Sequence, residues 1–360
     1  MDNISTYFNA QEVVNYADEK CKAEDASLWE ILFPAESAPS LELKWIKSSR
    51  RKTMALQLSA LDAHANRRGR LGAQRIIQEM PFFREEMPIS ETDRQELLKE
   101  IDRANGRENE IKSILSPVYD EHGGLVLGAY ANADIMAGML ITEAKIQIAT
   151  EDQSADYNYD DESSSWHSSN FTQLTGTATW TDANKATSDP LGDILAAIEA
   201  QENRGYKVAR IIMNSATFKA FCDSDSIHKS VAPLGGVVKK SDAKELLSNE
   251  TEAEIFIYNK NYLDSAGNTI KVIPDGYVVL TGEDALGRMY FGPTPEIFDK
   301  NNNKNMDGCD IACSQIDGVD CVGVECYTEK HPRVMNTVVS VAALPSFPEM
   351  DAVAVIKVKS

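Results

Sequence analysis

Apolar residues recur along this chain with two different periods, and the changes between them divide it into segments. Residues 1–40 combine a helical pattern over Gln11–Cys21 with a compact apolar group, Trp29 to Phe33, just ahead of Pro34. Such a segment has too few apolar residues to form a core of its own. We therefore expect an N-terminal arm that becomes ordered by lying on another surface.

Residues 41–88 carry the pattern of a long β-hairpin. Leu41–Lys47 alternates apolar and polar positions with one break, and a second extended run covers Met54–Leu61. A glycine-containing tip at residues 66–72 turns the chain back through a further apolar run that ends at Phe83. The hairpin can bury little of itself and would be marginal alone. We therefore predict an extended loop that reaches another subunit.

Helical periodicity follows the hairpin. Thr92 and Gln95 have capping-box spacing, and Asn105-Gly106 is expected to end this first helix. Gly123-Gly124 predicts a further break, ahead of a long helix over about Leu127–Lys145. That helix is rich in alanine and glycine, whose small side chains allow close backbone approach, so we expect it to lie tightly against a sheet.

Residues 150–188 are polar and acidic. Asp156, Asp160, Asp161 and Glu162 could ligate calcium, but their spacing matches no EF-hand loop. An exposed acidic hairpin is therefore the favoured interpretation.

At 360 residues the chain exceeds the usual size of one core, so two or three sub-domains are expected. One is an α+β sub-domain over residues 189–325. Asp189 stands at an N-cap, Pro190 at the first helical position and Gly205 just past the helix end. Strands are predicted at Val208–Met213, Ile255–Tyr258, Thr269–Ile273 and Tyr277–Leu280.

Two further strands close the chain, Thr337–Leu344 and Ala352–Val358, separated by Pro345 and Pro348. We expect them to pair with each other and to back the long helix.

Charge is strongly segregated. The chain carries 36 basic and 56 acidic residues, a net charge of −20, yet residues 44–84 hold ten basic residues against two acidic ones. This ribbon is +8 and the remainder −28. Such segregation favours an acidic partner, most simply another copy of the chain. The overall acidity argues against gripping nucleic acid with the surface at large. A container for nucleic acid stays compatible, because an acidic wall keeps packed polyanion from adhering.

Signals for membrane insertion or secretion are not evident. No run approaches the roughly 20 apolar residues that cross a bilayer, and the first residues lack the blocks of a signal peptide. We expect a chain that is made and folded in a cytoplasm.

Four of the six cysteines cluster, at Cys309, Cys313, Cys321 and Cys326, with His331 close behind. Zinc sites pair cysteines two to four residues apart, and these spacings fit only loosely. Free thiols in a reducing cell are favoured, with a metal site as the alternative.

A catalytic constellation is not found. The five histidines lie in no nucleophile-elbow or zincin motif. Gly235-Gly236 lacks the ending of a phosphate loop, and Asp299–Lys304 lacks the glycine and closing glutamate of a calcium loop. We expect no enzymatic activity and no cofactor, and a polar loop at Asp299–Lys304.

Three segments carry a family resemblance. They are Trp180 followed by Asp189–Ile194, then Ile273–Leu280, and finally Glu329–Arg333 running on through Ala343–Pro345. In their order along the chain, with the arm, basic hairpin and long helix before them, they resemble the major capsid proteins of tailed phages. The match is to the lambda-type capsid protein E family, which has the Hong Kong 97 fold.

The resemblance implies an α+β, Hong Kong 97-like capsid fold. Its parts would be an N-terminal arm (1–40), an extended basic β-hairpin loop (41–88), a peripheral domain with a long spine helix and the acidic hairpin (89–188), an axial domain (189–325) and return strands of the peripheral domain (326–360).

It also implies hexamers and pentamers tiled into an icosahedral shell around double-stranded DNA, in a virion assembled in a host cytoplasm. A portal and a decoration protein are implied partners. Since no long charged helix precedes the arm, a separate scaffold protein is implied too. The alternatives are a non-viral, encapsulin-like compartment and a metal-dependent enzyme using the cysteines with His331.

On this reading the basic loop lies on an acidic patch of the adjacent subunit, and the arm crosses another. Ile76, Ile77, Phe82 and Phe83 supply apolar contact. The residues expected to contact neighbouring subunits are Arg50, Arg51, Lys52, Arg67, Arg68, Arg70, Arg75, Ile76, Phe82 and Phe83.

Overall fold

The structure is a computed structural model. It describes residues 8–23, 26–47, 74–104, 107–149, 154–160, 166–232, 236, 238–264, 267–302, 309–331 and 333–359. Two compact units are built from interleaved segments. Unit 1 comprises Met1–Lys44, Ile77–Asp134 and Arg288–Ser346, and unit 2 comprises Trp45–Ile76, Ile135–Gly287 and Phe347–Ser360.

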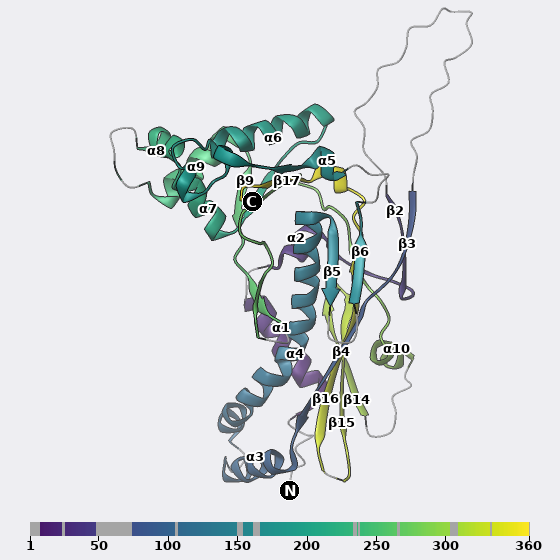
Figure 1. Ribbon diagram of the computed structural model, residues 1–360. Coiled ribbons are helices and arrows are strands. Elements are labelled where there is room, and N and C mark those ends of the chain that lie inside the picture. Colours follow the sequence, from purple (N-terminus) through teal and green to yellow (C-terminus); the bar gives the residue numbers. More distant parts are fainter. Residues whose placement is uncertain are drawn as a thin grey trace, which may run out of the picture. The chain divides into compact units, whose positions relative to one another are not determined.

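Unit 1 is organised by a six-stranded sheet whose central strand is β16 (Met335–Pro345), a run of eleven buried residues. The strand order is β1 (Ala35–Ser37), β13 (Met289–Phe291), β16, β15 (Val319–Thr328) and β14 (Cys309–Ile316). A strand buried on both faces reads as a continuous apolar run, which is why residues 335–345 lack alternation. Figure 1 shows β14, β15 and β16 side by side.

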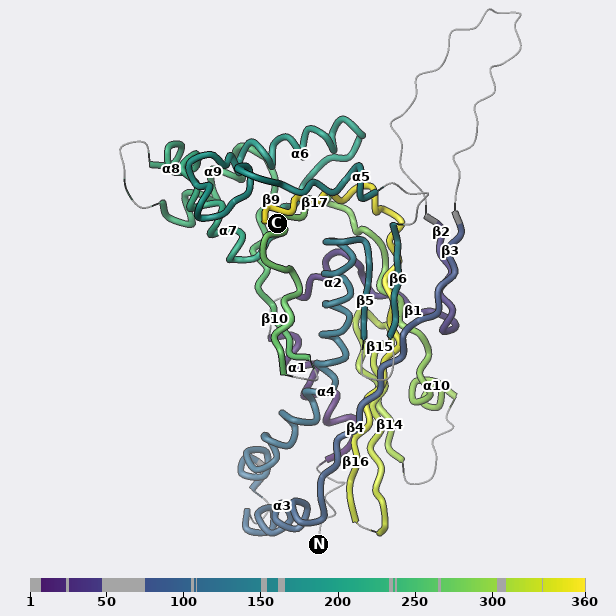
Figure 2. Tube along the Cα trace, in the orientation of Figure 1, coloured from purple at the N-terminus to yellow at the C-terminus, as the bar shows by residue number. Residues whose placement is uncertain are grey.

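β4 (Phe82–Ile89) is the sixth strand and pairs antiparallel with β16, from Met335↔Ile89 to Ala342↔Phe82. Figure 2 shows the chain passing from β3 (Gln74–Glu79) directly into β4. The hairpin expected over residues 41–88 therefore ends sooner, because its last seven residues find a ladder partner in the sheet. Only β2 (Glu42–Lys47) and β3 form a separate two-stranded sheet. The expected run Met54–Leu61 and the tip lie outside the described residues.

The N-terminal helix predicted at Gln11–Cys21 is confirmed as α1 (Ala10–Ala23), followed by α2 (Leu28–Leu32). Both pack within unit 1, where Trp29, Leu32 and Phe33 are fully buried. These helices are therefore ordered by their own chain, and the crossing of a neighbouring subunit stays a prediction. Their apolar faces are already covered by the sheet of the same chain.

α3 (Glu91–Ala104) begins at an N-cap two residues before the one predicted from the sequence. Ser90 Oγ accepts from the Asp93 backbone N–H at 3.2 Å and donates to the Asp93 carboxylate at 2.7 Å. The first-turn cap is therefore made by Ser90 and Asp93, not by Thr92 and Gln95.

α4 (Glu108–Glu143) runs unbroken for 36 residues, so the predicted break at Gly123-Gly124 is wrong. A Cβ on Gly123 would lie 3.1 Å from the ring of Tyr16. That glycine makes room for α1 to pack closely and does not end the helix. The predicted close approach holds further along, since a Cβ on Gly138 would lie 2.2 Å from the Val272 carbonyl oxygen.

α4 is also long and apolar enough to cross a membrane by length and composition alone. An 18-residue stretch of this helix has a mean hydropathy of 1.4, and 56% of the stretch is buried inside the protein. The expectation that no such run exists overlooked this helix, whose apolarity comes mainly from leucine, isoleucine, valine and methionine, with a smaller share from alanine. A core helix meets the same criterion.

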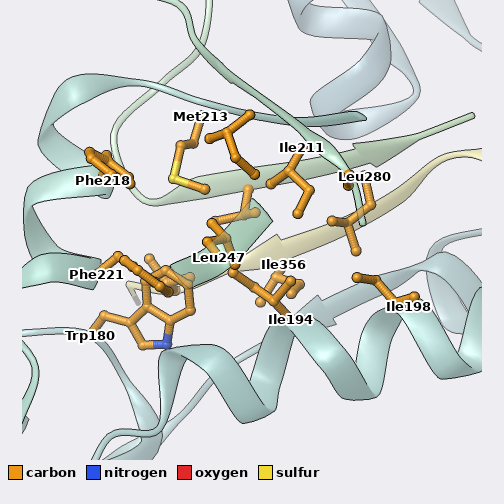
Figure 3. Packing of buried hydrophobic residues seen from close by; sticks show 14 of the residues in the cluster. Trp180, Ile194, Ile198, Ile211, Met213, Phe218, Phe221, Leu247, Leu280 and Ile356 are labelled. Carbon is orange, nitrogen blue, oxygen red and sulfur yellow. The ribbon is translucent and has the colours of Figure 1, made fainter. Parts of the chain in front are cut away.

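Unit 2 is built on a five-stranded sheet in the order β7 (Phe171–Gln173), β17 (Ala354–Lys357), β12 (Tyr277–Thr281), β8 (Arg210–Met213) and β9 (Glu254–Ile257). It packs with four helices, α6 (Pro190–Arg204), α7 (Ser215–Cys222), α8 (Asp225–Val231) and α9 (Lys240–Thr251). Figure 3 shows their shared core, with Ile198 and Leu280 toward one end and Met213, Phe218 and Phe221 toward the other.

The predicted boundaries of α6 are confirmed. The Asp189 side chain accepts from the Gly192 N–H at 3.4 Å, Pro190 opens the helix, and Gly205 closes it with a left-handed φ of 98°. The indoles of two nearby tryptophans are buried. Trp166 donates to the Met350 carbonyl and Trp180 to the Asp193 carboxylate, each at 2.9 Å.

The closing strands do not pair with each other, contrary to expectation. β16 belongs to unit 1, whereas β17 pairs with β12 and β7 in unit 2. β15 pairs with β16 and β14 pairs with β15, so neither strand joins the α+β sub-domain. The apolar pattern of a strand predicts that its faces are buried, but it does not predict which strand pairs with it.

Two hairpins, one short α-helix and three 3₁₀ segments complete the described part of unit 2. The expected acidic hairpin is β5 (Lys145–Ala149) with β6 (Ser154–Asn158), and a second pairs β10 (Asn261–Leu263) with β11 (Thr269–Lys271). The helices are α5 (Trp166–Asn170) and the 3₁₀ segments Gly176–Ala178, Asp182–Asn184 and Met350–Ala352. In unit 1, the polar loop expected from Asp299 is wrong as far as residue 302, because α10 (Pro295–Asn302) is helical there.

Candidate subunit interface

The base of the basic hairpin is anchored through one face of β2. Leu43 and Trp45 are buried, and the Trp45 ring stacks on Tyr159 with centroids 5.8 Å apart. Ile46 lies on the opposite, polar face and is 59% exposed. This residue is the one break in the predicted alternation, so the break was the sequence signal for an exposed apolar side chain.

β3 repeats the arrangement. Arg75 and Ile77 are both exposed, Ile77 by 56%, whereas Ile76 is half-buried and Met80 buried. The Met80 N–H donates to the Leu41 carbonyl at 2.8 Å, which joins the ends of the two strands. Within the described part of the chain, β2 and β3 pair only with each other. The hairpin base therefore exposes the guanidinium-bearing Arg75 and the apolar Ile77, which no element of the described chain covers fully.

Phe82 and Phe83 lie in the main sheet and not on the hairpin. Phe82 pairs with Ala342 and is 42% exposed, while Phe83 pairs with Val341 and is half-buried. Of this pair, Phe82 is the one available to a partner. The remaining predicted contact residues, Arg50, Arg51, Lys52, Arg67, Arg68 and Arg70, lie outside the described residues.

A buried carboxylate beside β4 was not found from the sequence. Glu296, in the first turn of α10, is 2% exposed. Its two oxygens accept from Arg84 on β4 and from the Ser340 hydroxyl on β16. A Cβ on Gly323 would lie 2.9 Å from Glu296 Cβ, so the glycine of β15 leaves room for this group. Ser340 lies 44 positions from Glu296 in the chain and Arg84 lies 212 positions from it, so no local sequence pattern reveals this network.

α1 is tied to the sheet by a short polar chain. Ser314 Oγ on β14 donates to the Asp18 carboxylate at 2.5 Å and lies 2.6 Å from the hydroxyl of Tyr130 on α4. The Ala10 N–H donates to Asp310 at 2.8 Å, at the start of the helix. These hydrogen bonds hold α1, which is part of the arm, against β14 and α4.

His122 is the buried titratable group of this region. It is 1% exposed, and its ring meets Phe8 edge-on with centroids 5.0 Å apart. Nδ1 has no hydrogen-bond partner within the described residues. Burial lowers the pKa of His122 to about 4, because the charged imidazolium loses its hydration.

This pKa predicts a loss of stability in mild acid. The unfolded chain takes up the proton near pH 6.5 and the folded chain only near pH 4, so stability held above pH 6.5 is lost as the pH falls toward 4. The loss is on the order of 3 kcal/mol. Urea unfolding of the unassembled subunit at pH 7 and pH 4.5 measures it. His122→Leu should flatten this dependence and the exposed His331→Gln should not; an unchanged slope in His122→Leu would contradict the assignment.

The strand pairing separates the four clustered cysteines between the two faces of the sheet. Cys309 and Cys313 lie on one face of β14, while Cys326 is paired with Asp310 and therefore faces the other side. Burial raises the pKa of Cys313 and Cys326 to about 11 and that of Cys321 to about 12, so these thiols stay protonated at neutral pH. The described residues contain no group of three or more His, Cys, Asp or Glu side chains placed to hold a metal ion. The geometry of this cluster therefore gives the metal-enzyme alternative no support.

The acidic segment is also accounted for without calcium. Asp156 accepts from Gln147 and pairs with Lys145, and Asp160 accepts from the backbone N–H groups of Trp166 and His167 at 3.0 and 2.9 Å. Asp161 and Glu162 lie outside the described residues.

A cavity of about 460 Å³ in unit 1 is lined by Phe8, Asn9, Gln11, Asp310, Cys326, Thr328 and Met335. Its carboxylate is occupied by the Ala10 N–H. The lining therefore offers no paired acid and base.

Solved structures share this fold at low sequence identity. A candidate capsid protein of a prophage from E. coli CFT073 aligns with a TM-score of 0.60 and 11% identity, covering 98% of this chain and 99% of that one. A phage-related protein of Bordetella bronchiseptica RB50 gives 0.55 and 14%, covering 97% and 96%. A chain of the cyanophage A-1(L) capsid gives 0.52 and 10%, covering 93% and 92%. A sequence search of curated proteins returned no match.

The fold is therefore the Hong Kong 97-like α+β fold. The sequence model for phage major capsid protein E matches residues 28–358. The chain belongs to the phage major capsid protein E family. It is a structural protein of the bacteriophage virion, where it contributes to the capsid shell.

Proposed function

We propose that this chain assembles into hexamers and pentamers that tile an icosahedral shell around double-stranded DNA. The observation that carries the proposal is the hairpin base, which exposes Arg75 and Ile77 next to a ribbon of +8 on a chain of −20. A cationic, partly apolar projection is complementary to the acidic surface of another copy. Charge steers the encounter and sets the register, while apolar burial supplies the affinity.

We propose the following domain assignment. Unit 1, with its six-stranded sheet and the N-terminal part of α4, is the peripheral domain. The five-stranded sheet of unit 2 with α6 to α9 is the axial domain. The extended loop then covers residues 41–81, since β4 belongs to the peripheral sheet, and α1 and α2 pack in the peripheral domain.

The energetics of one contact are small. An exposed ion pair contributes about 0–1 kcal/mol. Burying the exposed halves of Ile46 and Ile77 adds about 1 kcal/mol each. In a closed shell every subunit makes and receives this contact, so the sum over many copies stabilises the assembly.

Reversing the charge of the loop tests the contact. Arg67→Glu, Arg68→Glu and Arg70→Glu together should raise the protein concentration needed for assembly about 10-fold or more, because each attraction becomes a repulsion. Sedimentation and negative-stain microscopy measure it.

A matched control changes the net charge equally. Lys99, Arg103 and Lys112 are exposed on α3 and α4, and their replacement by glutamate should leave assembly near the wild-type level. Intact shells from the loop variant would overturn the inter-subunit contact.

The proposed shell itself is tested by imaging the protein expressed alone and with its genomic neighbours. Closed shells or capsomer rings support the proposal, and nuclease-protected DNA in particles from infected cells supports the cargo. A compact monomer under all conditions would contradict it.

A further inference from the structure

An aromatic cluster joins the start of the described chain to α4. The Phe8 ring, just ahead of α1, stacks on Tyr119 with centroids 5.4 Å apart and meets His122 edge-on at 5.0 Å. Tyr16 on α1 stacks on the same tyrosine at 5.6 Å, and Gly123 leaves room for its ring. Figure 1 shows α1 alongside α4. We call Phe8, Tyr16, Tyr119 and His122 the aromatic seam, and His122 is its one member that takes up a proton in mild acid.

The His122 ring has no group in place to compensate a positive charge. The side chain is 1% exposed, and Nδ1 has no hydrogen-bond partner within the described residues. Burial lowers the pKa of His122, and no nearby carboxylate opposes that effect. A protonated ring would therefore lose its water without gaining a counter-ion, which is costly inside a folded protein.

The titratable and charged groups around the seam are engaged elsewhere or face the solvent. They are Glu12 and Lys20 on α1, Asp120 and Glu121 on α4, Asp310 on β14 and Cys326 on β15. Asp120 accepts from the Tyr16 hydroxyl at 2.6 Å and pairs with Lys20, while Asp310 accepts from a backbone N–H of α1. Glu12 and Glu121 are exposed, and the Cys326 thiol stays protonated at neutral pH. A charge on His122 is thus relieved most directly by water, which requires the seam to open.

α1 is held to unit 1 by a small set of contacts. Its buried residues are Ala10, Val13, Val14 and Ala17, none of them large. Hydrogen bonds from Ala10 to Asp310 and from Ser314 to Asp18 add to them. The cavity of about 460 Å³ is lined by Phe8, Asn9 and Gln11, so the start of α1 has open space beside it. Elements with few buried apolar contacts open more readily than the core they cover.

We propose that residues 8–23 form a latch that acid releases: protonation of His122 favours a state in which α1 has left the seam and water reaches the ring. The open state binds a proton as an ordinary histidine does, whereas the closed state resists it, so falling pH shifts the population toward the open state. The apolar stripe of α1 is then available to bind another surface. The latch is a property of the single subunit and goes beyond the proposed assembly into a shell.

Hydrogen exchange tests the latch on the unassembled subunit. Mass spectrometry at pH 7 and pH 5 follows the amides of α1, with those of α6 as the internal reference. The same peptides in His122→Leu cancel the ordinary effect of pH on exchange. The ratio of wild-type to variant exchange in α1 should rise about 30-fold between pH 7 and pH 5, because the open state binds the proton near pH 6.5 and the closed state only near pH 4. The ratio for α6 should stay constant.

Two further variants accompany this measurement. Phe8→Ala keeps the histidine but removes the ring that covers it, so the pKa of His122 should move toward its ordinary value in an NMR titration, and α1 should exchange faster at pH 7. This variant carries the test if His122→Leu does not fold. The exposed His331→Gln is the matched control and should exchange as the wild type does at both pH values.

Three outcomes would overturn the latch. If α1 and α6 accelerate equally in acid, the subunit unfolds as a whole and α1 is not released by itself. If the wild type and His122→Leu differ by the same factor at both pH values, or do not differ, the ring only fills space. If the pKa of His122 is the same in Phe8→Ala as in the wild type, Phe8 is not the cover of the ring. Shell formation enters none of these readouts, so each leaves the proposed function as it stands.

Discussion

Replacing Gly138 with alanine is expected to destabilise the subunit by about 3 kcal/mol or more. The new Cβ would lie 2.2 Å from the Val272 carbonyl oxygen and 2.7 Å from a methyl group of the same residue. Gly138 is buried in the C-terminal part of α4, and backbone atoms cannot move aside as the end of a flexible side chain can. The helix or the segment after β11 would have to shift.

The matched control lies on the same helix. Gly128 is exposed and nothing lies within 4 Å of a Cβ built on it, so Gly128→Ala should stabilise the subunit by about 0.5–1 kcal/mol through helix propensity. Urea unfolding of the unassembled subunit measures both. Equal effects of the two substitutions would show that the helix does not approach Val272 as closely as described.

Replacing Glu296 with alanine is the second large effect, about 3 kcal/mol of destabilisation. The substitution removes two hydrogen bonds to a charged group and leaves the fully buried Ser340 hydroxyl without its acceptor. Arg84 is 46% exposed and can return to water, which limits the loss. Glu296→Gln keeps an acceptor for Ser340 and should cost about half as much.

Glu85 provides the comparison, since it is an exposed carboxylate on the same strand as Arg84 and forms no ion pair within the described residues. Glu85→Ala should change the unfolding free energy by less than about 0.5 kcal/mol. Denaturant unfolding resolves these differences. A Glu296→Ala subunit as stable as Glu85→Ala would mean that the buried carboxylate does not bridge β4, β16 and α10.

Local signals in the sequence predicted local structure well. The cap, the proline and the glycine of α6 lie within or beside the helix they delimit, and all three took the predicted roles. The alternation of Leu43 and Trp45 with Lys44 and Ile46 likewise gave the correct buried face of β2. Capping and periodicity involve residues a few positions apart, so the neighbouring sequence is enough to specify them.

Predictions that depended on a segment far away in the sequence were less successful. Gly123-Gly124 has the composition of a break, but α1 packs against it and the helix continues. The four cysteines are close in sequence, but the pairing of β14 with β15 puts them on both faces of the sheet. Neither the docking of α1 nor the register of the two strands is written in the residues immediately around them.

The residues along the chain were enough to predict the basic ribbon, most of the helices and strands, and the resemblance to phage capsid proteins. Which strands share a sheet became known from the folded chain, in which β4 joins β16 and the two closing strands lie in different units. The fold also brought Glu296 to Arg84. The physical reason is that an apolar pattern specifies that a face must be buried, whereas the choice of partner depends on packing between segments far apart in the chain.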